Sequence, residues 1–390
     1  MDKSKIFKSS ILLILVGLIT KIFASVAKIV MARNLTTNAM GIYMLVVPMY
    51  IFFINVIQLS LPTTIATKIA KNPRQTNKII ISSSAISLVV NVVFMILIYT
   101  FSSYIASTIL KNQEARLSII SLSLLVPLIS LGGLIKGYYM GIGKIEVSAY
   151  SQISEEIARI LFIILFVNIF KDKGDAYLAY GAFLSLCAGE IFSLSHMIIA
   201  MPNIKNKPKL FAKGVTNKEN YIIKDILLTA VPLTGGKLIS TIAYSLEPII
   251  MSSVLSKLGY DLSYVTGEYG VISGLVFPLL LMPGFFASSL ARVLLQPLTT
   301  SIAQNEYTKA KKLTISITLT SFFIGLFFCV LLLMFPKFIM NLLYGGYKGY
   351  EYIKIFALPF VFYYIEAPLI SVMMVISNSK KIMFMILWFL

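Results

Sequence analysis

Roughly ten apolar stretches, each about as long as the hydrocarbon core of a bilayer is thick, constrain this chain more than any other feature. A chain in lipid must satisfy its backbone hydrogen bonds internally, so such stretches form helices. Hydrophobic residues make up 58% of the 390 residues, which excludes a soluble multidomain protein. We therefore expect an all-α integral membrane protein. Helices are predicted at 6–32, 41–66, 79–109, 117–140, 147–170, 176–200, 223–256, 268–298, 312–336 and 351–377, and an eleventh begins at Ile382.

Composition excludes several other kinds of protein. The formal net charge is +18, but the lysines lie between apolar stretches and form no stripe with base-stacking residues, which argues against nucleic-acid binding. Cys187 and Cys329 both lie inside apolar stretches, so we expect neither a disulfide framework nor a metal site. No P-loop is present, and we expect no cofactor.

The loops carry an orientation signal. Lys and Arg are concentrated in the loops around 68–78, 205–224 and 309–312, and are sparse in the loops on the opposite side. Cytoplasmic loops of membrane proteins carry this excess of positive charge. We therefore expect a multi-pass protein with a cytoplasmic N-terminus.

The second half of the chain repeats spacings of the first. Lys21 opens the sequence Lys-Ile-Phe-Ala-Ser-Val-Ala, and Lys237 opens Lys-Leu-Ile-Ser-Thr-Ile-Ala. Two pairs of prolines share one spacing, 62 − 48 = 14 and 297 − 283 = 14. The pattern predicts an internal duplication, although chance similarity between apolar helices is the alternative.

A duplicated unit of six helices enters the membrane twice from the same side, so its two copies are parallel. We expect an N-terminal six-helix bundle at 1–200, a cytoplasmic basic linker at 201–222 and a C-terminal bundle at 223–390. Two parallel, pseudo-symmetric bundles of about six helices are a known transporter architecture that works by alternating access. The second bundle has only four full helices, so we expect it to be truncated in helix 11.

Several segments together carry a family resemblance. They are the stretch 12–45 with Lys21 and Lys28, Leu61-Pro62, Lys136-Gly137-Tyr138-Tyr139-Met140-Gly141, Ser151-Gln152, Glu155-Glu156 with Arg159, and Glu268-Tyr269-Gly270. In these segments the chain resembles the stage V sporulation protein B family of the multidrug/oligosaccharidyl-lipid/polysaccharide exporter superfamily.

The resemblance implies a flippase rather than an enzyme. Such a protein moves a lipid-linked oligosaccharide or peptidoglycan precursor, similar to lipid II, from the inner to the outer leaflet of the bacterial cytoplasmic membrane. Its partners would be that lipid-linked saccharide, membrane lipids and a coupling ion, sodium or proton. A drug/cation antiporter of the same superfamily is the alternative, and it would need acidic residues facing the cavity.

Basic residues inside or beside the apolar stretches are the candidate substrate-binding residues. Lys21 and Lys28 are seven residues apart and share one helical face with several small residues, which suits a cavity that accepts an anion. The alternative is that Lys28 extends to the interface and Lys21 pairs with a carboxylate. Lys237 is the counterpart of Lys21, Arg33 lies at the outer mouth of the first helix, and Arg292 lies near the cytoplasmic end of helix 8.

Acidic residues form two further candidate groups. Gln152, Glu155, Glu156 and Arg159 would form a gate, a packing salt bridge or a first contact with the headgroup, since Glu155 and Arg159 have ion-pair spacing. Glu190, Glu247 and Glu366 lie within apolar stretches and either bind a coupling ion or neutralise a buried lysine. Because Glu366 lies between Pro359 and Pro368, we expect its helix to be broken.

Overall fold

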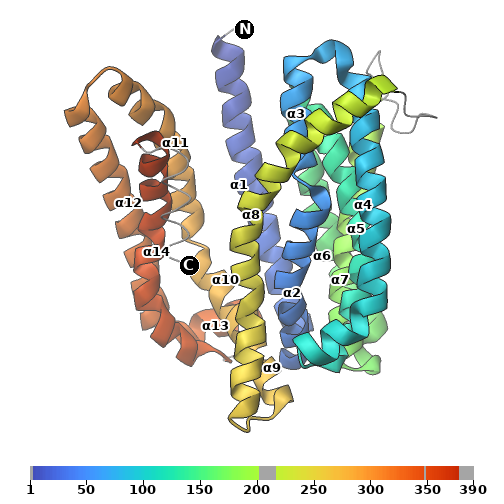
Figure 1. Cartoon of the computed structure of the whole chain (residues 1–390). Helices are drawn as coiled ribbons and strands as arrows, with labels where there is room; N and C mark the ends of the chain where they lie inside the picture. Colours follow the sequence, from blue (N-terminus) through green and yellow to red (C-terminus); the bar gives the residue numbers. More distant parts are fainter. Residues whose placement is uncertain (1–2, 202–216, 347, 377–390) are drawn as a thin grey trace. The chain divides into compact units, whose positions relative to one another are not determined.

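The computed structural model describes residues 3–201, 217–346 and 348–376, and these residues are helical with no strand (Figure 1). Eight helical segments are long and apolar enough to cross a membrane. The prediction of an all-α membrane protein is therefore confirmed. The α-helices are α1 (Lys3–Asn34), α2 (Thr37–Gln58), α3 (Leu61–Lys71), α4 (Thr76–Tyr104), α5 (Arg116–Gly141), α6 (Ile145–Phe170), α7 (Asp175–Ile199), α8 (Asn217–Lys257), α9 (Leu262–Val271), α10 (Phe277–Leu281), α11 (Gly284–Ala303), α12 (Tyr307–Met334), α13 (Pro336–Tyr344) and α14 (Tyr350–Ile376).

The chain divides into two compact units, Met1–Gly270 and Val271–Leu390. The first unit holds α1 to α8 and nearly all of α9, and the second holds the remaining helices. Most of the predicted linker 201–222 and the helix expected from Ile382 lie outside the described residues. The predicted boundaries of the two bundles therefore stay a prediction.

Two of the predicted helices are interrupted. The helix expected at 41–66 ends at Gln58 and resumes at Leu61, because Leu59 and Ser60 adopt left-handed backbone conformations, with φ of 46° and 49°. Pro62 then occupies the first turn of α3, where its missing N–H costs no hydrogen bond. The helix expected at 268–298 is likewise divided into α9, a π-helical turn, α10 and α11. Pro283, which lacks an N–H and restrains the backbone before it, directly precedes α11.

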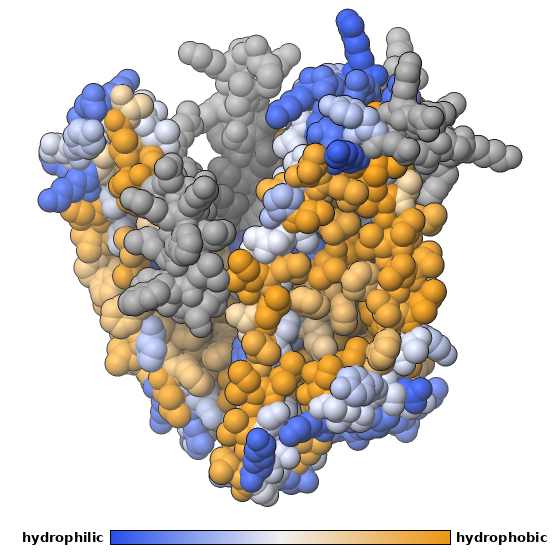
Figure 2. Space-filling view, viewed as in Figure 1, coloured by the Kyte–Doolittle hydropathy of each residue, from blue (hydrophilic) through white to orange (hydrophobic). Residues whose placement is uncertain are grey.

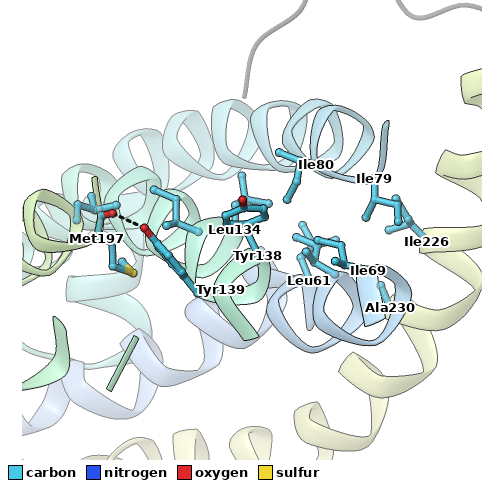
Figure 3. Packing of buried hydrophobic residues seen from close by; sticks show 13 residues of the cluster. Leu61, Ile69, Ile79, Ile80, Leu134, Tyr138, Tyr139, Met197, Ile226 and Ala230 are labelled. Atoms are coloured by element: carbon cyan, nitrogen blue, oxygen red, sulfur yellow. Dashed lines mark hydrogen bonds between the residues drawn. The ribbon is translucent and has the colours of Figure 1, made fainter. Parts of the chain in front are cut away.

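The first unit is held together by a buried cluster drawn from α3, α4, α5, α7 and α8 (Figure 3). Within it, the Tyr139 hydroxyl donates a hydrogen bond of 2.8 Å to the Met197 carbonyl oxygen. Ile226 and Ala230 of α8 are fully buried in the same cluster. Beside it, Lys68 Nζ lies 2.5 Å from Asp225 Oδ2. The first turns of α8 are thereby joined to the core of the first unit.

The second unit is organised by contacts among α11, α12 and α14. Cys329, Val361 and Tyr364 form a buried cluster, and Phe322, Leu326 and Phe360 pack against it. The Tyr364 hydroxyl donates to the Leu280 carbonyl oxygen at 2.6 Å. Aromatic and aliphatic side chains therefore form this core.

The surface of the helices matches a membrane environment. Hydrophobic side chains cover the middle of the helices and hydrophilic ones gather near their ends (Figure 2). On α4, for example, Leu88, Val92 and Ile96 are exposed and recur at helical spacing. Exposed apolar stripes on long helices indicate contact with lipid, so the chain is a multi-pass membrane protein.

Candidate functional site

The centre of the candidate site is an ion-pair network on α6. Arg159 Nη2 lies 2.8 Å from Glu155 Oε1, four residues earlier. The other terminal nitrogen, Nη1, donates to both oxygens of Glu156 at 2.8 Å. Residues three and four apart share one face of a helix, which is why a single guanidinium reaches both carboxylates. The ion pair expected between Glu155 and Arg159 is therefore present, and Glu156 extends it.

A lysine from a second helix joins this network. Lys136 Nζ of α5 lies 3.5 Å from Glu155 Oε2. The side chains of Lys136, Glu155, Glu156 and Arg159 are all largely buried, with exposed fractions of 10–21%. Buried ion pairs carry a large desolvation cost, and ionisable residues inside a membrane are usually functional. The network is therefore a candidate functional site, and a packing salt bridge between helices stays the alternative.

The neighbouring helix α7 comes close to this network because of a glycine. A Cβ at Gly189 would lie 3.0 Å from the Glu155 carbonyl oxygen and 3.3 Å from its Cγ, so a larger residue would separate α6 from α7. The next residue is Glu190, which is buried and interacts electrostatically with Lys136, Glu155, Glu156 and Arg159. One of the three predicted coupling carboxylates thus lies beside the network.

Lys28 of α1 is the third cation near the network. Helices α1 and α6 pack against each other, and Lys28 interacts electrostatically with Glu156 and Arg159. Its side chain is nevertheless exposed, and within the described residues it makes no ion pair. Lys28 is therefore an exposed cation close to the buried network.

The other substrate-binding candidates on the first unit lie outside the network. Lys21 lies two turns before Lys28 on the continuous helix α1 and is half-buried, while Arg33 is exposed in the last turn of that helix. Gln152 is exposed on α6, one turn before Glu156. On α8, Lys237 is exposed. Its role in binding substrate stays a prediction.

The remaining two coupling candidates have different surroundings from Glu190. Glu247 on α8 is exposed and accepts a hydrogen bond from the Tyr269 hydroxyl. Glu366 is exposed on α14 in the second unit. The expectation of a broken helix around Glu366 is wrong, because α14 runs without interruption from Tyr350 to Ile376. A helix can pass through a proline when the lost hydrogen bond is tolerated in its surroundings.

Two further points complete the description of the site. Arg292 lies on α11 in the second unit, and its side chain is outside the described residues. Among the described residues, no group of three or more His, Cys, Asp and Glu side chains is placed to hold a metal ion.

Lys136 is the network residue that the site prediction missed. The sequence contained one signal for it, a lysine within an apolar stretch of α5, where a charge is costly. Its partner Glu155 lies 19 residues away on another helix. Spacing rules along a single helix cannot find such a pair.

Comparison with known proteins agrees with this architecture. The chain is 26% identical to stage V sporulation protein B of Bacillus subtilis over 390 residues, which is 98% of this chain and 75% of that protein. It is 21% identical to sporulation protein YkvU of the same organism over 333 residues, 81% of this chain and 71% of that protein. These similarities confirm the resemblance seen in the sequence.

A solved structure has the same fold. It is an inward-facing multidrug resistance MATE family transporter of the MOP superfamily, with a TM-score of 0.70 and 14% sequence identity. The match covers 93% of this chain and 83% of the transporter. Residues 6–301 also match the family described as polysaccharide biosynthesis protein. The chain therefore belongs to the polysaccharide biosynthesis protein family, and its fold is similar to that of the solved transporter.

Proposed function

We propose that this protein is a flippase that moves a lipid-linked oligosaccharide or peptidoglycan precursor, of the lipid II type, from the inner to the outer leaflet. The family supports a role in polysaccharide biosynthesis, and the fold is that of a membrane transporter. Both observations favour transport over catalysis. Neither the family nor the fold identifies the saccharide, so the class of substrate is inferred from the chemistry of its headgroup.

The main support for this proposal is that Lys28 is exposed and makes no ion pair in the described part of the chain. A lipid-linked saccharide presents a phosphate or pyrophosphate, which needs a cation that is accessible and not already neutralised. The carboxylates of Glu155 and Glu156 are occupied by Arg159, while Lys28 beside them is exposed without an ion pair in the described part of the chain. Lysine binds phosphate as a point charge, so Lys28 and Lys21 on the same helix would hold the headgroup.

The proposed path follows from the charges and the lipid tail. The headgroup enters from the cytoplasmic side, where the positive loops and the N-terminus lie in our orientation. Gln152 and the α6 network make the first contacts, Lys237, Arg33 and Arg292 provide further positive charge, and the tail stays in the membrane. Alternating access then exposes the headgroup to the other leaflet, driven by the membrane potential or an ion gradient.

The test measures lipid II in the outer leaflet of bacteria depleted of their own flippase. Cells would express the wild-type protein, Lys28→Ala, Lys21→Ala or the double variant, with membrane levels matched by immunoblotting. Losing a charge-assisted contact of about 1.5–3 kcal/mol lowers transport about tenfold to a hundredfold. Lys28→Arg should retain most activity because it keeps the positive charge.

Lys309→Ala is the matched control, because Lys309 is an exposed lysine whose carboxylate partner, Glu306, is also exposed. It should transport at the wild-type rate. Wild-type levels of outer-leaflet lipid II with the Lys21 and Lys28 double variant would contradict the basic site. Failure of the wild-type protein on lipid II and on undecaprenyl-linked polysaccharide units would contradict the flippase itself.

A drug/cation antiporter is the second candidate, because the fold is shared with a multidrug transporter. That activity needs an acidic group available to a cation, whereas Glu155 and Glu156 are engaged by Arg159. Ethidium efflux from the same cells separates the two functions. Efflux that depends on Glu247 or Glu366 would favour the antiporter.

A further inference from the structure

Glu190 has an unusual environment for a carboxylate inside a membrane protein. It is only 8% exposed, and its Oε2 atom is buried without a hydrogen-bond partner among the described residues. On one side this oxygen lies against Gly132 of α5: a Cβ built on Gly132 would lie 3.2 Å from Oε2 and 3.9 Å from Leu194 Cδ2 of α7. The oxygen therefore faces a tight, largely apolar contact between two helices.

Titratable groups on α2, α5, α6 and α7 interact electrostatically with Glu190, but none forms an ion pair with it in the described residues. They are Tyr50 on α2, Lys136 on α5, Glu155, Glu156 and Arg159 on α6, and Cys187 on its own helix. Arg159 is engaged with Glu155 and Glu156, and Lys136 with Glu155. The nearby positive charges are thus already directed at other carboxylates.

An ionised carboxylate in this position would have no direct counterion. Removing a charge from water without pairing costs several kcal/mol or more, and a buried group avoids that cost by binding a proton. A sodium ion would need several oxygen ligands around it, whereas Oε2 lies against Gly132 and has no hydrogen-bond partner among the described residues. The space and the chemistry suit a proton and not a metal cation.

We propose that Glu190 is a proton-binding site that is occupied at neutral pH and controls the charge of the α5–α6–α7 network. The network has three cations, Lys28, Lys136 and Arg159, and three carboxylates, Glu155, Glu156 and Glu190. With a proton on Glu190 the net charge is 3 − 2 = +1, and without it the net charge is 3 − 3 = 0.

This charge change links the proton to an anion, a consequence that rests on the proposed function. The positive state attracts a phosphate-bearing headgroup at Lys28, and by reciprocity a bound headgroup favours the proton on Glu190. Loss of the proton lets Glu190 compete with Glu155 for Lys136, which changes the contact between α5 and α6. Proton release and release of the anion are therefore coupled.

Infrared spectroscopy of the purified full-length protein in liposomes tests the proton site independently of transport. The wild-type protein should show a protonated carboxyl C=O band at pH 7 that is absent in Glu190→Gln. Glu247→Gln is the matched control and should keep the band, because Glu247 is exposed and accepts a hydrogen bond from Tyr269. A band that survives in Glu190→Gln, or is absent from the wild type, overturns the proposal.

If Glu190→Gln fails to fold, Lys136→Met decides the same question. It removes a positive charge that favours the ionised form of Glu190, so the band should persist to higher pH than in the wild type. An unchanged titration would overturn the assignment.

A second measurement tests the link to the substrate, with farnesyl pyrophosphate as the probe. At the pH where half of the wild-type infrared band has been lost, binding of the probe should take up a proton in the wild type and none in Glu190→Gln, recorded with a pH-sensitive dye in weak buffer. Binding without proton uptake by the wild type overturns the coupling. If neither protein binds the probe, the proposed headgroup is wrong, while the infrared band still decides whether Glu190 holds a proton.

Discussion

The helices of the two compact units pack through different kinds of contact. The first unit buries an ion-pair network between α5 and α6, with a carboxylate of α7 beside it. The second unit packs α11, α12 and α14 through aromatic rings and small residues, and its ion pair among the described residues, Lys309–Glu306, is exposed. Among the described residues, the buried ion pairs therefore lie in the first unit, whereas the helices of the second unit are held together mainly by the packing of apolar side chains.

This contrast bears on the predicted duplication. A gene duplication starts with two equal copies, so a network in only one of them would have been gained or lost after the event. The repeated proline spacing does not preserve the local structure, since α2 is followed by a break at Leu59 and Ser60, whereas α11 is preceded by Pro283. Similar sequence spacing is therefore compatible with different local geometry.

The largest effect should come from removing the cation at the centre of the network. Arg159→Met leaves Glu155 and Glu156 buried with much less positive charge, which should destabilise the protein by about 3–5 kcal/mol. Thermal unfolding of the purified protein in detergent measures this loss. The variant that combines Arg159→Met with Glu156→Gln should recover much of it, because Glu155 keeps Lys136 as its partner and Glu156 no longer carries an unpaired charge. If Arg159→Met were as stable as the wild type, the ion-pair network would not stabilise the first unit, and the contrast between the two units would be wrong.

The second unit should be most sensitive to a change of shape. Gly325 of α12 lies against the Tyr364 ring, and a Cβ there would come within 2.0 Å of Tyr364 Cδ2. We expect Gly325→Ala to cost about 1–3 kcal/mol through overpacking, measured in the same unfolding assay. Gly236→Ala on α8 is the control, since a Cβ there meets nothing within 4 Å. It should be neutral or slightly stabilising, because alanine favours the helix. If Gly325→Ala were no less stable than Gly236→Ala, the contact with Tyr364 would not limit the packing of the second unit.

Much of the fold could be predicted because its signals are local. The helices expected at 79–109 and 117–140 match the helical segments at 76–109 and 116–141 to within a few residues, since long apolar runs leave little choice in a membrane. The breaks were missed because Leu59 and Ser60 are apolar or small and carry no local turn signal. Their backbone conformation depends on packing that a single sequence does not contain.

The site was predictable only where its contacts lie on one helix. The spacing of Glu155 and Arg159 predicted their ion pair, and the same helix supplied Glu156. The contact of Lys136 with Glu155 depends on how α5 packs against α6, which the sequence does not state. The lack of a partner for Glu190 Oε2 depends in the same way on how α7 packs against its neighbours. Sequence could name these charged residues but not say which were paired.

The two units should respond alike to the loss of one buried hydroxyl. Tyr139→Phe removes the hydrogen bond to Met197 in the first unit, and Tyr364→Phe removes that to Leu280 in the second. Each change should cost about 1 kcal/mol, because the ring remains in place and one strong hydrogen bond is lost; the 4.0 Å contact that Tyr364 accepts from Cys329 Sγ is weak. Tyr99→Phe, at an exposed tyrosine of α4, serves as the control and should have no measurable effect. A much larger loss in Tyr139→Phe would mean that polar contacts dominate the first unit beyond its charges.

The smallest effect should come from the ion pair of the second unit. Lys309 and Glu306 have the same three-residue spacing as Arg159 and Glu156, and the atoms are 2.9 Å and 2.8 Å apart. Their side chains are 64% and 44% exposed, compared with 19% and 10% for the buried pair. Water and salt weaken an exposed pair, so Lys309→Ala should change stability by less than about 0.5 kcal/mol. Raising the salt concentration should remove even that difference, while leaving the large loss in Arg159→Met nearly unchanged. Since sequence spacing and distance are matched, a large effect of Lys309→Ala would show that burial is not what separates the two units.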